Sequence, residues 1–217
     1  MYKRKKETAS IVICSMVATT LFMSGVVYQA AETGTRIQYA SAATSSAVTV
    51  SASVDATISC STNAAATAFG TLTTGAVATG DTNTSTTMSC ANSSGGCTLY
   101  VKDAGGGGNP GLWNSSASYL IPSVSSTLVA GTEGYGVNAT TTAGGGGGSF
   151  TIAAHYKLGS DTATTTVGGM LTTNQSLATV NSTSSQREVV VRHKAAIAGG
   201  TSAGSYADTI TYECTAN

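Results

Sequence analysis

An all-β fold, built as an antiparallel β-sandwich and preceded by an N-terminal signal segment, is the structure that this sequence predicts. Three observations support it. Apolar and polar side chains alternate from Val48 to Cys60, several further short runs rich in Thr, Val and Ile are separated by turn residues, and four cysteines remain after the signal segment. Alternation with a period of two is typical of a strand with one buried and one solvated face. Many short strands separated by turns are typical of sandwiches and barrels.

Residues 1–42 have the features of an export signal. A basic start from Lys3 to Lys6 precedes an apolar run from Ile11 to Val27, and small residues end the segment at Ala42. This order is typical of a secretory signal peptide that is cleaved after Ala42. An uncleaved anchor, with its basic end in the cytoplasm, is the alternative. We expect contact with a membrane only through this segment.

The remainder of the chain, residues 43–217, is expected to form a single domain with few charges. Only 9% of all residues are charged, against roughly 25% in typical globular domains. Beyond Ala42 the chain has five basic and eight acidic residues, a net charge of −3. A chain without a basic surface is not expected to bind nucleic acid. The abundance of Thr and Gly favours strands over helices.

The four cysteines of the predicted domain are expected to form two disulfides, because an even number in an exported chain indicates a disulfide framework. Three connectivities are possible for four cysteines. Cys90 and Cys97 flank a turn-rich segment, where they would face each other across a hairpin. Cys60 ends the first strand-like run and Cys214 ends the last, and first and last strands are often neighbours in sandwiches. Zinc would need short Cys pairs that the spacing does not supply, so neither a metal nor a cofactor is expected.

Further strands are predicted along the domain. They are Ala68 to Leu72, Thr84 to Cys90, Cys97 to Asp103, Ser118 to Pro122, Gly134 to Thr140, Phe150 to Leu158, Glu188 to Ala198 and Ser205 to Thr215. The glycine runs from Gly105 to Gly108 and from Gly144 to Gly148 are expected to be flexible surface loops. Tyr206 enters the last strand after a glycine turn. That position is typical of the tyrosine corner, which makes the predicted sandwich immunoglobulin-like.

No motif in the domain predicts an enzyme. Gly200 to Gly204 fits the G-x-S-x-G pattern of serine hydrolases, with Ser202 in the nucleophile position. That pattern needs a helix after the serine and a histidine later in the chain, whereas both histidines here come earlier. We therefore interpret Ser202 as part of a hairpin loop. His193 lies on the apolar side of its strand and is interpreted as a core or rim residue.

Three stretches resemble segments of a group of bacterial surface proteins. Ala203 to Tyr212 is similar to the last strand of these proteins, Phe69 to Leu72 to their "FG-x-L" segment, and Thr86 to Val101 to the hairpin that follows. The group includes β-sandwich proteins of the WxL cell-wall-binding type, spore coat U-like proteins and fimbrial-type subunits. The WxL triplet itself is absent. The resemblance implies an extracellular envelope protein with a structural or adhesive role, and it implies no catalytic residue.

Two functions are expected from these features. The first is that of a secreted or cell-surface structural protein, such as a pilus-like subunit, that assembles with itself or with other surface subunits by β-strand pairing. Its donor would be the stretch from Ala43 to Cys60, although the same alternation also fits an ordinary first strand. The alternative is an extracellular adhesin or carbohydrate-binding module. Trp113, Tyr119 and Tyr135 would then stack on a cell-wall or surface glycan.

Overall fold

The computed structural model describes residues 25–26, 41–42, 46–63, 66–142, 144–157 and 164–217. The chain divides into two compact units. The first, Met1–Ser53, contains β1 (Gly25–Val26), which pairs antiparallel with β2 (Ser41–Ala42). Apart from these two short strands, the predicted signal segment at residues 1–42 lies outside the described residues. The second unit, Val54–Asn217, contains all the other strands.

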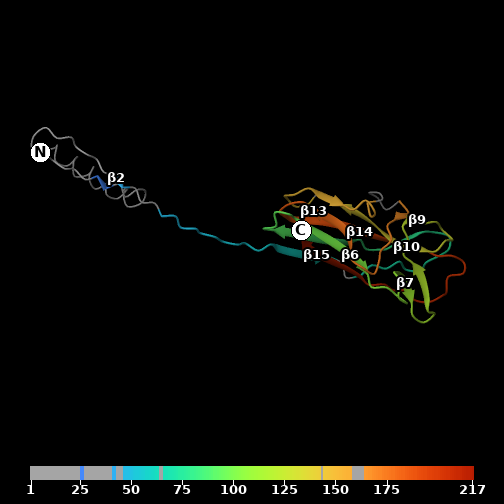
Figure 1. Ribbon diagram of the computed structural model, residues 1–217. Coiled ribbons are helices and arrows are strands. Elements are labelled where there is room, and N and C mark those ends of the chain that lie inside the picture. Colours follow the sequence, from blue (N-terminus) through green and yellow to red (C-terminus); the bar gives the residue numbers. More distant parts are fainter. Residues whose placement is uncertain (1–24, 27–40, 43–45, 64–65, 143, 158–163) are drawn as a thin grey trace, which may run out of the picture. The chain divides into compact units, whose positions relative to one another are not determined.

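Two antiparallel sheets make up most of the second unit, and its described residues contain no helix (Figure 1). The first sheet has the strand order β10-β14-β5-β3, and β4 also pairs with β14. Its strands are β3 (Thr57–Thr62), β4 (Ala78–Thr79), β5 (Thr84–Ala91), β10 (Gly134–Thr141) and β14 (Ser184–Ala196). The second sheet has the order β11-β13-β6-β15. Its strands are β6 (Cys97–Asp103), β11 (Phe150–Ile152), β13 (Gln175–Val180) and β15 (Ile210–Ala216). The predicted all-β, antiparallel fold is confirmed.

Two smaller strand pairs accompany the sheets. β7 (Gly111–Asn114) and β8 (Tyr119–Pro122) form a hairpin, and β9 (Ser126–Thr127) pairs with β12 (Thr166–Val167). A second, smaller apolar cluster of Leu128, Val167 and Ala196 joins the β9–β12 region to the end of β14. Val167 also lies against Gly136 of β10, so this region covers part of the outer side of the first sheet.

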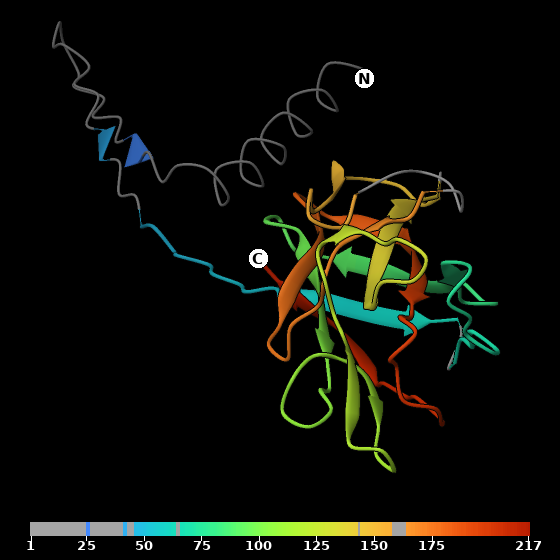
Figure 2. The ribbon, with the colours of Figure 1, turned by 90° about the vertical axis from the view of Figure 1, so that its right-hand side faces the viewer.

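One hydrophobic core lies between the two sheets, because each sheet sends alternate side chains inward. Val189 and Val191 of β14 are fully buried in it, as are Leu99 of β6 and Leu177 of β13. His193 follows the alternation of β14 and is also buried, in agreement with its interpretation as a core or rim residue. Two sheets that share a core in this way are consistent with the predicted β-sandwich (Figure 2).

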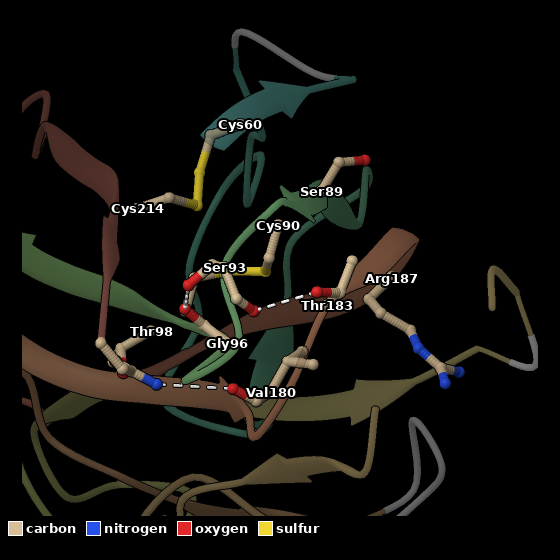
Figure 3. The surroundings of a disulfide bond; sticks show 12 residues. Cys60, Ser89, Cys90, Ser93, Gly96, Thr98, Val180, Thr183, Arg187 and Cys214 are labelled. Atoms are coloured by element: carbon tan, nitrogen blue, oxygen red, sulfur yellow. Dashed lines mark hydrogen bonds between the residues drawn. A yellow bond between two sulfur atoms is a disulfide. The ribbon is translucent and has the colours of Figure 1, made fainter. Parts of the chain in front are cut away.

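Both disulfides join one sheet to the other, as Figure 3 shows. Cys60 of β3 is bonded to Cys214 of β15, and Cys90 of β5 is bonded to Cys97 of β6; the Cα atoms are 6.1 Å and 5.9 Å apart. These distances are usual for disulfides. The pairs are those predicted, but the expected hairpin between Cys90 and Cys97 is wrong. β5 pairs with β3 and β14 while β6 pairs with β13 and β15, so the short link crosses between sheets.

The alternating stretch from Val48 to Cys60 is not one long strand. Only β3 (Thr57–Thr62) belongs to a sheet. Residues 46–56, which we call the lead segment, form no strand and are exposed along their whole length. Alternation shows that a segment can present an apolar face, but a strand also needs a neighbouring strand to bond. The lead segment has the first property and lacks the second.

Both glycine runs contact large side chains of the domain. Arg187 donates from its guanidinium group to the carbonyl oxygens of Gly144, Gly147 and Gly148. In the other run, Gly106 lies so close to Trp113 that a Cβ at that position would overlap the Trp side chain. Both runs therefore allow close approach of the backbone to a large side chain, which is an established role of glycine.

Candidate functional site

A cleft of about 1130 Å³ lies beside the ends of β3 and β15. Its walls are formed by the segment 66–72, which follows β3, and by the segment 201–208, which precedes β15. Residues from four further strands complete it: Thr84 of β5, Leu112 of β7 (Gly111–Asn114), Tyr135 of β10 and His193 of β14. The cleft is thus assembled from segments that are far apart in the sequence.

The two strands at the cleft are edge strands, and their inner faces are incompletely covered. Among the strands that the structure describes, β3 pairs only with β5 and β15 pairs only with β6. Ile58 is the one partly buried residue of β3, and Ile210 and Tyr212 of β15 are only partly buried. By contrast, alternate residues of the central strands, such as Met88 of β5 and Val191 of β14, are fully buried. The sandwich therefore lacks cover on the side where β3 and β15 meet.

The cleft has an apolar side. Phe69, Leu72, Ile197 and Ile210 line it and pack against the main core while remaining partly exposed. The ring of Phe69 meets that of Tyr135 edge to face, with centroids 6.2 Å apart. Partly exposed apolar side chains around a concave site are typical of a surface that binds an apolar partner.

Polar groups form another part of the cleft lining. Asp208 lines the cleft, its carboxyl group lies near Asp103 and Tyr135, and its Oδ2 atom is buried without a well-formed hydrogen bond. The Tyr135 hydroxyl lies 2.9 Å from Nδ1 of His193. Asp103 accepts hydrogen bonds from the backbone N–H groups of Gly105 and Gly111, at 2.6 and 2.8 Å. Unpartnered buried polar atoms are rare in native proteins, which makes this part of the lining unusual.

Burial dominates the titration of these groups. It raises the pKa of Asp208 to about 7, and the negative charge of Asp103 acts in the same direction. It also raises the pKa of Asp103, against the effect of the two backbone donors. Burial lowers the pKa of His193 to about 4, so the imidazole is neutral at pH 7. Burial raises the pKa of Tyr135 well above its usual value, so its hydroxyl stays protonated.

The loop before β15 is fixed by Tyr206. Its ring packs against the core, and its hydroxyl donates to the carbonyl oxygen of Ser202 at 2.7 Å. The backbone hydrogen bond predicted for Tyr206 is therefore present, but Tyr206 lies before the last strand, because β15 begins at Ile210. Ser202 lies between β14 and β15, in a segment without a helix. The predicted loop is present, but the hairpin is wrong, because β14 and β15 belong to different sheets.

The aromatic residues predicted to bind a glycan do not lie on one surface. Trp113 is opposite Leu120 in the β7–β8 hairpin whereas Tyr119 is opposite Asn114, so the two aromatic side chains project from opposite faces. The Tyr119 hydroxyl donates to Glu133 at 2.6 Å. Tyr135 is 2% exposed and belongs to the core, where its hydroxyl faces the cleft.

The described residues contain no group of three His, Cys, Asp or Glu side chains that could hold a metal ion. In the same part of the chain, no helix has the length and apolar character needed to cross a membrane. The four predicted cysteines are all in disulfides. Asp208, which lines the cleft, and the buried Asp103 beside it were not predicted as site residues, because isolated acidic residues carry no motif.

Comparisons with protein-family models, with curated proteins and with solved structures gave no match to this chain.

Proposed function

We propose that this protein is an extracellular or cell-surface structural subunit, similar in role to fimbrial-type subunits, that assembles by docking the lead segment of one copy into the cleft of the next. One observation carries the proposal. The sandwich leaves a cleft with an apolar side at the ends of β3 and β15, two edge strands joined by the Cys60–Cys214 disulfide, and the same chain carries an exposed segment whose alternating pattern presents an apolar face.

The chemistry of the lead segment fits the cleft. Val48, Val50 and Val54 are 83%, 88% and 75% exposed, and they lie two or four residues apart, so an extended chain presents them on one face. Burial of a Val side chain contributes about 1.5–3 kcal/mol. Asp55 is the only charged residue of the segment, so docking of the stretch before it buries no charge of its own.

The free edges supply the other half of the interaction. β3 and β15 each have one side without a neighbouring strand, and an added strand would form backbone hydrogen bonds there. Exposed edges in native proteins are normally protected by Lys, Pro or bulges. β3 has none of these, since its sequence is Thr-Ile-Ser-Cys-Ser-Thr.

The direction of the chain favours docking between copies. The lead segment joins β3 at Thr57, whereas the cleft begins at Thr62, at the other end of the strand. These ends are about 17 Å apart at about 3.3 Å per residue. A donor at one end and an acceptor at the other form a head-to-tail contact, which generates chains of subunits when it does not close into a ring.

The disulfides fit an extracellular location. Both join the two sheets, and structural disulfides of this kind persist in oxidising compartments. The alternative function, a carbohydrate-binding module, is less well supported, because Trp113 and Tyr119 project from opposite faces of their hairpin and Tyr135 is buried.

The proposal is tested by placing charge on one face of the lead segment. Val48→Asp combined with Val50→Asp is expected to abolish assembly, because each carboxylate would have to enter the apolar cleft. The matched control is Thr49→Asp with Ser51→Asp, which adds the same charge to the opposite face and is expected to keep assembly. Light scattering after size exclusion and negative-stain microscopy measure the result. An unsubstituted protein that stays monomeric at high concentration would contradict the proposal, as would equal loss of assembly in both variants.

A further inference from the structure

Asp208 lines the cleft with Asp103 beside it, and the charge of this acidic pair affects the docking of the lead segment. The inference rests on the proposed function. Asp208 lies on the cleft and is partly exposed, so water still reaches this residue. A docked strand would displace water from the cleft. A carboxylate that loses its hydration without gaining partners is strongly disfavoured.

The surroundings of Asp208 supply little compensation for a negative charge. Its own backbone neighbour Thr209 donates one hydrogen bond, to Oδ1 at 2.7 Å, while Oδ2 lacks a well-formed one. Asp103, from β6, faces it with a carboxyl group of the same charge. No lysine or arginine of the described residues is among the groups that shift its pKa.

The remaining groups around the pair are neutral near pH 7. Tyr135 of β10 faces Asp208, and behind it His193 of β14 is neutral because burial lowers its pKa to about 4. Tyr212 of β15 also lines the cleft, and burial raises the pKa of its hydroxyl. Two carboxyl groups side by side in such surroundings favour a state in which they share one proton.

We propose that docking of a donor strand is linked to proton uptake by the Asp103–Asp208 pair, so that the cleft accepts the strand when the pair holds a proton and resists it when both carboxyl groups are ionised. Assembly then strengthens in mildly acidic surroundings and weakens as the pH rises above neutrality. The pair acts by changing the charge beside the cleft, and no covalent bond is formed or broken.

The test is the binding of a synthetic peptide with the sequence of residues 46–54, acetylated and amidated so that it carries no titrating group. The acceptor is the full chain with Val48→Asp and Val50→Asp, whose own lead segment does not compete. We expect the affinity to fall as the pH rises from 6 to 8, by up to about tenfold per pH unit for the uptake of one proton. Calorimetry in two buffers of different ionisation enthalpy counts the protons directly.

Two further variants identify the carboxyl group that takes up the proton. Asp208→Asn in the same background is expected to bind the peptide with an affinity that does not change between pH 6 and pH 8. Glu213→Gln alters an exposed carboxyl group of β15 outside the cleft and is expected to keep the full pH dependence.

Each outcome separates the inference from the function on which it rests. Peptide binding without proton uptake, or a pH dependence that persists in Asp208→Asn, overturns the inference and leaves the proposed function standing. Absence of peptide binding throughout this pH range overturns both. The proton count on the acceptor with both aspartates in place decides the question even where Asp208→Asn does not fold.

Discussion

The two ends of the sandwich are built from the same strands but are closed in different ways. At one end, the Cys90–Cys97 disulfide joins the sheets (Figure 3). At the same end, Asn217 ties the end of β15 to Gly96 and Thr98 by hydrogen bonds of 3.1 and 2.7 Å. At the other end lies the cleft, with partly exposed apolar groups and the buried, unpartnered Oδ2 of Asp208. The comparison shows that the first end is closed by contacts within the chain, whereas the second end keeps an open cleft, where we propose that a second copy docks.

The largest expected effect is the difference in stability between loss of one disulfide and loss of the other. Removal of Cys60–Cys214 frees a loop with a sequence separation of 154, against 7 for Cys90–Cys97. Loop-closure entropy then predicts a loss of about 5 kcal/mol in the free energy of unfolding for the first pair and about 2 kcal/mol for the second. Urea unfolding of the two paired Cys→Ser variants measures the difference. If loss of Cys90–Cys97 were the more damaging, the closed end would be the main source of stability.

A second comparison uses one glycine from each end. Gly96, at the closed end, has φ = 78°, and a Cβ there would overlap the carbonyl oxygen of Val180. Gly70, at the cleft, has φ = 64° and nothing within 4 Å of a Cβ. We expect Gly96→Ala to cost about 4 kcal/mol, from positive φ and overpacking together, and Gly70→Ala about 1 kcal/mol, from φ alone. Thermal unfolding of both variants measures the difference, and equal losses would show that the closed end is not packed more tightly.

The pH dependence of stability is expected to originate at the cleft end. The pKa of His193 is about 4 in the folded protein against 6.5 in the unfolded chain, so its contribution is complete above pH 6.5 and is lost as the pH falls towards 4, by about 3 kcal/mol. The pKa of Asp208 is about 7 against 3.8, so its contribution is complete below pH 3.8 and is lost as the pH rises towards 7. Between pH 4.5 and 6.5, a rise in pH therefore increases the stability contribution of His193 and decreases that of Asp208.

Two variants separate the effects of His193 and Asp208 on the pH dependence of stability. His193→Gln leaves Asp208 to act alone, and stability is expected to fall as the pH rises from 4.5 to 6.5. Asp208→Asn leaves His193, and stability is expected to rise over the same range. Urea unfolding at several pH values measures both. Parallel curves for the two variants would show that neither group governs the response.

The sequence predicted the core and the disulfides better than the lead segment and the cleft. Alternation correctly placed Val189 and Val191 of β14 in the core, and cysteine positions at the ends of strand-like runs gave the two disulfides. Alternation did not predict that Val48 and Val50 would be exposed, because the pattern shows which side of a segment is apolar but not what covers that side. Nor did it predict the cleft, because contacts between distant segments leave no local pattern.

The smallest expected effect concerns the loop that forms one wall of the cleft. The hydroxyl of Tyr206 donates to the carbonyl oxygen of Ser202, and its loss in Tyr206→Phe is expected to cost about 1 kcal/mol of stability, because a single partly buried hydrogen bond contributes about 0.5–1.5 kcal/mol. The ring still packs against the core, so the fold is kept while the loop loses this hydrogen bond. Hydrogen exchange is expected to increase at residues 201–208 and to stay unchanged around Cys90 and Cys97. An increase at both ends would mean that the two ends open together, and the cleft would then not be a separate, adjustable part of the molecule.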